Sequence, residues 1–267
     1  MAIPLQNDST RGRMRVRINI QPIVLSAAFL FVCPAFWAAE IAKAPLPSDE
    51  VAAVKITGTE TQRLANLREY SVVRTYTLRN SHLGNDVTMT ARLSYRREEG
   101  KTFEVLTVDG ASGVAKKVLE RLLQSEAEES HKDTGDEFEI TTSNYGFHVV
   151  GADVLNGRPC YVVEVTPKRK SKYLLQGKVW ADAKEFAVVK IEGHPAASLS
   201  MWVGKPHVVQ EFQKVGPFWM PSYNRSDSKN FMLGASELTI DYNGYQVGPH
   251  VLTAELQNGK APSSQED

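Results

Sequence analysis

The second half of the chain is a succession of short segments in which apolar and polar residues alternate, separated by turn residues. Asn156-Gly157 lies between two of these segments and is the strongest short-range signal for a β-hairpin. Because strands joined by tight turns in sequence order pair antiparallel, this half of the chain predicts a β-meander. The expected hairpins cover residues 144–167, 174–193 and 207–224, and the last strand covers 236–247.

The first half adds further strands and a helix. Residues 70–80 and 87–96 also alternate with a period of two, and 101–110 follows after a turn. Residues 112–130 predict a helix, with Ser112 as its N-cap. Its apolar stripe must cover a sheet face, the only large apolar surface expected in this fold. The stripe consists of Val114, Val118, Leu119 and Leu122.

About ten strands exceed what a flat sheet accommodates, so the sheet must bend or close. We therefore expect an α+β fold: a strongly curved antiparallel β-sheet, an unclosed half-barrel, with helices on its concave face. A short helix is expected near 50–54, and Gly58 and Thr59 argue against extending it. The alternative is that residues 62–69 form the last turn or two of a longer N-terminal helix.

An apolar run from Ile23 to Ala39 follows four arginines and ends in small residues. This arrangement is typical of a secretory signal peptide with cleavage near Ala38-Ala39. We do not expect Cys33 to carry a lipid anchor, because a lipobox needs a small residue before the cysteine and Val32 is branched. The expected organisation is a signal peptide at 1–39, a linker at 40–50, the half-barrel domain at 51–256 and a disordered tail at 257–267.

Composition excludes several classes of function. The chain has 31 basic and 31 acidic residues, so no net charge favours a nucleic acid as partner. Of its two cysteines one lies in the predicted signal peptide, so Cys160 cannot form an internal disulfide in the exported chain. We expect Cys160 to be a buried small hydrophobe; a reactive thiol is the alternative.

No catalytic or metal-binding motif is present. The histidines form neither an H-x-x-x-H nor an H-E-x-x-H pair, and no G-x-S-x-G elbow occurs. We therefore predict no catalytic residues, no metal and no cofactor. A hydrolase built on His148 or His207 is the least favoured alternative. Asp182 and Glu185 read as turn residues, and the basic run 168–172 reads as a solvated loop or as a dock for an acidic partner or lipid head groups.

Aromatic residues crowd the second half of the chain. Many must belong to the core, but a single helix cannot cover the concave side of a ten-stranded sheet. The surplus apolar surface predicts a ligand cavity or a partner interface. The residues expected to line the cavity are Phe147, Tyr161, Trp180, Phe186, Phe212 and Trp219.

Three stretches, NGRPCYVVEVTPK, KVWADAKEFAVVKIEG and EFQKVGPFWMPSYN, together with SELTIDYNGYQV, resemble bacterial outer-membrane lipoprotein-sorting proteins of the LolA/LolB-like superfamily. The resemblance covers roughly 140–245 and implies an unclosed barrel with a helical lid and a hydrophobic cavity for lipid acyl chains. It implies a non-enzymatic periplasmic carrier or chaperone for a lipid acyl chain or a lipidated protein. The alternative is a regulatory or scaffold module that binds an envelope protein partner through an edge strand or the basic loop.

Overall fold

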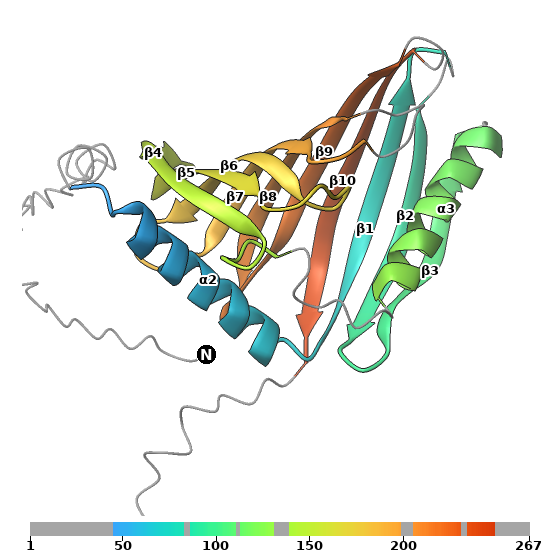
Figure 1. Ribbon diagram of the computed structural model, residues 1–267. Coiled ribbons are helices and arrows are strands. Elements are labelled where there is room, and N and C mark those ends of the chain that lie inside the picture. Colours follow the sequence, from blue (N-terminus) through green and yellow to red (C-terminus); the bar gives the residue numbers. More distant parts are fainter. Residues whose placement is uncertain are drawn as a thin grey trace, which may run out of the picture. The chain divides into compact units, whose positions relative to one another are not determined.

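Ten strands and two helices make up the part of the chain that the structure describes (Figure 1). The computed structural model describes residues 45–82, 86–110, 113–130, 139–198, 205–230 and 234–248. The predicted signal peptide, Cys33 and the predicted tail lie outside the described residues.

The helices are α2 (Asp49–Asn66) and α3 (Gly113–Ser130). The strands of the first group are β1 (Glu69–Asn80), β2 (Val87–Arg96) and β3 (Gly100–Asp109). The strands of the second group are β4 (Tyr145–Leu155), β5 (Arg158–Pro167), β6 (Leu175–Asp182), β7 (Val188–Pro195), β8 (His207–Val215), β9 (Phe218–Asn230) and β10 (Gly234–Val247).

All ten strands belong to one antiparallel sheet in the order β3-β2-β1-β10-β9-β8-β7-β6-β5-β4. The two groups are each a meander, and pairing of β1 with β10 joins them. Among the described residues β3 and β4 therefore stand at the two edges, and the sheet is not closed. The predicted fold class is confirmed.

Local turn chemistry sets the register of the hairpins. Asn156 and Gly157 have φ angles of 51° and 76°, the left-handed conformation that a type I′ turn requires at both central positions. Asp182 shapes the next turn, since its Oδ1 accepts hydrogen bonds from the backbone N–H groups of Lys184 (2.9 Å) and Glu185 (2.7 Å). Asp182 is thus a turn former, as the sequence predicted.

The first helix is longer than predicted and begins inside the segment expected to be a linker. Ser48 caps it by accepting a hydrogen bond from Val51 N at 3.3 Å. Ala52, Ile56 and Glu60 are buried at intervals of four residues, so one face packs along the whole length. The alternative in which 62–69 forms the last turns of the helix is close to what is observed, since the helix ends at Asn66. Gly58 lies on the exposed side, and packing outweighs its low helix propensity.

The apolar stripe of α3 is also shifted from the one predicted. Leu119 is buried and Leu122 packs against the same cluster, as expected, but the buried partners of Leu119 are Ala115 and Leu123, and Val118 is 51% exposed. Ala115, Leu119 and Leu123 recur at intervals of four residues and so form one face of the helix, which is buried. Ser112 and the side chain of Val114 lie outside the described residues. No helix in the described part of the chain is both long and apolar enough to span a membrane.

Candidate functional site

Both helices lie on the same face of the sheet. One row of direct cross-strand partners crosses the sheet, and such partners point to the same face. The row runs through Met89, Tyr76, Ile240, Asn224, Gln210, Ile191, Val179 and Val163. Its first three members pack with Leu119 of α3, and its last three pack with Ile56 of α2. We call this the helix face.

The helix face carries two separate apolar clusters. The cluster beneath α3 is built on β1, β2 and β10, and the cluster beneath α2 is built on β4 to β7. From the border of the cluster beneath α3, against which Leu238 packs, toward the other cluster extends a group of side chains on β8, β9 and β10 that remain partly exposed. We call this group the central strip; it consists of Val208, Gln210, Asn224, Ser226 and Leu238.

A buried ion network attaches α3 to the sheet. Arg74 of β1 is 5% exposed and donates two hydrogen bonds to the carboxylate of Glu126 on α3, at 3.1 and 2.9 Å. Lys101 of β3 reaches the same carboxylate at 2.8 Å. Burial would raise the pKa of Glu126, but Lys101 and Arg74 outweigh it and lower the pKa to about 2. Glu126 is therefore fully ionised near neutral pH.

The start of α2 is held to the sheet by a second polar contact. Asp49 accepts a hydrogen bond from Val149 N of β4 at 2.7 Å and lies 3.0 Å from Nδ1 of His148. The hydrogen bonds from Val149 and His148 lower the pKa of Asp49, and Asp49 in turn raises the pKa of His148. His148 is therefore one half of a helix-to-strand contact.

Three of the predicted cavity residues lie together on the helix face. Phe147, Tyr161 and Phe186 belong to the cluster beneath α2, and the rings of Tyr161 and Phe186 are 5.4 Å apart. Phe186 is 7% exposed and has a positive φ of 56°. Phe212 packs against this cluster and against a second one on the opposite face.

The structure places the other two predicted residues on the opposite face. Trp180 and Trp219 pack with Cys160 and Val189 there. The indole N–H of Trp180 donates to Asp153 (3.0 Å), and that of Trp219 donates to Glu185 (2.9 Å). Cations cover both rings: Lys190 lies 4.3 Å from the centroid of Trp180, and Arg158 lies 4.7 Å from that of Trp219. The six residues thus do not meet in one cavity.

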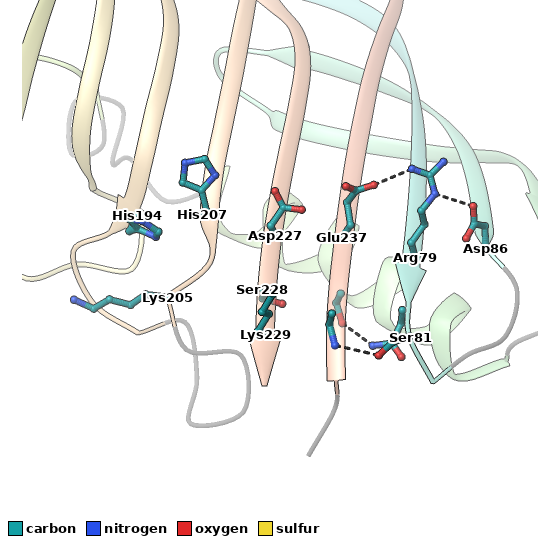
Figure 2. A pocket seen from close by; sticks show the side chains of 13 residues that line it. Arg79, Ser81, Asp86, His194, Lys205, His207, Asp227, Ser228, Lys229 and Glu237 are labelled. Carbon is teal, nitrogen blue, oxygen red and sulfur yellow. Dashed lines mark hydrogen bonds and ion pairs between the residues drawn. The ribbon is translucent and has the colours of Figure 1, made fainter. Parts of the chain in front are cut away.

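A hollow of about 680 Å³ opens near the ends of β1, β7, β8, β9 and β10 and is lined mainly by polar and charged side chains. Figure 2 shows Arg79 between Asp86 and Glu237, with which it forms ion pairs of 2.8 Å each. His207 and Asp227 are cross-strand partners in the same row. The charged side chains that line the hollow thus largely neutralise one another. Among the described residues, no group of three or more His, Cys, Asp or Glu side chains is arranged to hold a metal ion.

The basic run forms the loop between β5 and β6. Lys168 donates to Thr142 O (2.6 Å) and Arg169 to Asn144 Oδ1 (2.7 Å), so both help to hold the segment before β4. Lys170 and Lys172 are exposed. Docking of an acidic partner or lipid head groups to this loop stays a prediction.

Sequence reasoning missed the central strip and the Arg74–Glu126 network. The alternation in β10 already assigns Leu238 and Ile240 to one face, but the pairing of β10 with β1 was needed to place that face beneath α3. The contact between Arg74 and Glu126 joins residues far apart in the chain, so no local sequence pattern predicts it.

No protein-family model and no curated protein matches the chain. The solved structures that resemble it include a DUF1329 family protein from Desulfovibrio piger, 11% identical with a TM-score of 0.43, covering 80% of this chain and 98% of that one. A LolA superfamily protein from Nitrosomonas europaea is 9% identical with a TM-score of 0.41, covering 79% and 97%. A domain described as outer membrane lipoprotein-sorting, from Vibrio parahaemolyticus, is 15% identical with a TM-score of 0.42, covering 76% and 95%.

Proposed function

We propose that the protein is a non-enzymatic periplasmic carrier that binds the acyl chain of a lipid or lipidated protein on the helix face of its sheet. The observation that carries this proposal is the central strip, where two partly exposed apolar side chains, Val208 and Leu238, accompany three polar ones on the face that carries both apolar clusters. Val208 and Leu238 extend the apolar surface from one cluster toward the other. The predicted signal peptide supports the periplasmic location.

The physical basis of binding would be the transfer of hydrocarbon from water to the strip. Each buried methylene gains about 0.8 kcal/mol. From β10 to β7 the helix face spans three inter-strand spacings, about 14 Å, which gives an extended chain room to lie across the strands. Movement of α3 would add surface, because its cluster includes Met89, Leu93 and Tyr76 beneath the helix.

The test is titration of the purified, delipidated protein with a fluorescent fatty acid. Val208→Asp places a charge in the strip and is expected to weaken binding at least tenfold. Val209→Asp is the matched control, because Val209 is the next residue on β8, is also partly exposed and points to the opposite face. The proposal would be contradicted if the unmodified protein does not bind the fatty acid, or if both variants lose affinity for it to the same extent.

A second candidate function, the binding of an envelope protein partner through an edge strand, is supported by the two edges of the sheet. The edge strand β3 exposes Val105 and Leu106, and the edge strand β4 exposes Val150 and Val154. Exposed edges with apolar side chains can accept a strand from a partner protein. This function would be favoured if the unmodified protein takes up no fatty acid but retains an envelope protein, and if the Val105→Lys or Val150→Lys variant no longer retains that partner.

A further inference from the structure

Two carboxamide side chains stand next to each other in the middle of the helix face. Gln210 of β8 and Asn224 of β9 are direct cross-strand partners. On the β7 side Gln210 is paired with Ile191, and on the β10 side Asn224 is paired with Ile240. Ile191 is 8% and Ile240 is 9% exposed, so the amides interrupt a row that is otherwise apolar and buried.

Neither carboxamide side chain contributes a hydrogen bond to the described part of the fold. Among the described residues, the side chains of Gln210 and Asn224 have no hydrogen-bond partner, whereas Asn80 and Asn144 both hydrogen-bond to other residues. Each carboxamide offers an NH₂ donor and a C=O acceptor, and both side chains are only partly exposed. In the free protein water can satisfy them; a ligand lying on the strip must offer matching groups or leave them unpaired at a cost of about 1–3 kcal/mol each.

We propose that Gln210 and Asn224 bind a secondary amide group that joins an acyl chain to its head group. This proposal rests on the proposed function and names the chemistry that the strip selects. A secondary amide presents one donor and one acceptor, and a pair of carboxamide side chains can form hydrogen bonds with both at once. An ester or a bare hydrocarbon chain cannot donate, so it leaves a side-chain acceptor unpaired. The acyl chain then lies against Val208 and Leu238, beside the amides.

The experiment compares two probes with the same fluorescent acyl chain, one ending in a secondary amide and one in the corresponding ester. The unmodified protein is expected to prefer the amide probe about tenfold, the equivalent of one to two net hydrogen bonds. The double variant Gln210→Met and Asn224→Leu keeps the approximate size of both side chains and removes their donors and acceptors. It is expected to bind both probes equally, with affinity for the ester unchanged or higher. Gln176→Met is the control, because Gln176 is an exposed carboxamide paired with His194 on the opposite face.

A second measurement does not depend on how the variants fold. In a ¹⁵N spectrum of the unmodified protein, the side-chain NH₂ signals of Gln210 and Asn224 are expected to shift when the amide probe is added and to shift less with the ester. Equal binding of the two probes by the unmodified protein, unmoved NH₂ signals, or a preference that survives the double variant would overturn the proposal. If neither probe binds, the carrier function fails as well; if both bind without preference, only this inference fails.

Discussion

Arg74 of β1 donates two hydrogen bonds to Glu126 of α3, at 3.1 and 2.9 Å, and thereby joins the third strand from one edge of the sheet to a helix residue more than fifty positions further along the chain. Lys101 of β3 binds the same carboxylate. Loss of the negative charge would leave the buried Arg74 and the partly buried Lys101 without their shared counter-charge, which is strongly unfavourable. The attachment of α3 should therefore depend on the ionisation of Glu126.

Acid is expected to weaken the fold through Glu126. Its pKa is about 2 in the folded protein against an ordinary 4.5, so its contribution is fully present above pH 4.5 and is lost as the pH falls toward 2. The shift corresponds to about 3 kcal/mol. The free energy of unfolding from urea titrations at pH 7, 4 and 3 measures the loss. Glu126→Gln should be less stable than the unmodified protein at pH 7 and should lose less on acidification; parallel pH curves for the two proteins would contradict this.

The two neighbouring residues Leu119 and Val118 should differ strongly in their contribution to stability. Leu119 is fully buried between α3 and the sheet, whereas Val118 is 51% exposed. Leu119→Ala should lower the free energy of unfolding by about 3 kcal/mol, because it leaves a cavity in the cluster beneath α3. Val118→Ala should change it by less than about 0.5 kcal/mol. Similar losses for both would mean that α3 presents the face predicted from the sequence.

The strands and their turns were predictable because their signals are local. Alternation of apolar and polar residues over 87–96 and the Asn156-Gly157 pair each depend on a few adjacent residues. The helices were less predictable. Tertiary packing stabilises α2 beyond Gly58, and the buried face of α3 includes Ala115, which has a weak apolar signal in the sequence.

The candidate site was predictable only in part, because the face of an aromatic residue depends on bulges and pairing. Strict alternation along β6 already separates Trp180 from Val179. Irregularities in register occur at Trp180/Ala181 and at Glu211/Phe212, and such bulges change which face the following residues occupy. Gln210 and Asn224 give no signal in sequence, since each is an ordinary polar residue in a strand until pairing brings the two together.

Gly58 offers a test of the packing account of α2. It lies on the exposed side of the helix, and a Cβ added there would meet no atom within 4 Å. Gly58→Ala should therefore raise the free energy of unfolding by about 1 kcal/mol, since alanine loses less backbone entropy in a helix. Gly157→Ala is the contrasting variant: its φ of 76° strains any residue with a Cβ, so stability should fall. A destabilising Gly58→Ala would show that the helix needs flexibility at this point.

Cys160 should be unreactive in the folded protein. It is fully buried in the cluster on the face opposite the helices, and burial raises the pKa of its thiol to about 11. The thiolate, which is the nucleophile, is therefore both scarce and inaccessible near neutral pH. Iodoacetamide at pH 7.5 should label Cys160 only in denaturant, and peptide-resolved mass spectrometry separates this signal from Cys33. Labelling of the native protein at the rate of a free thiol would instead indicate a reactive cysteine and an open path to it.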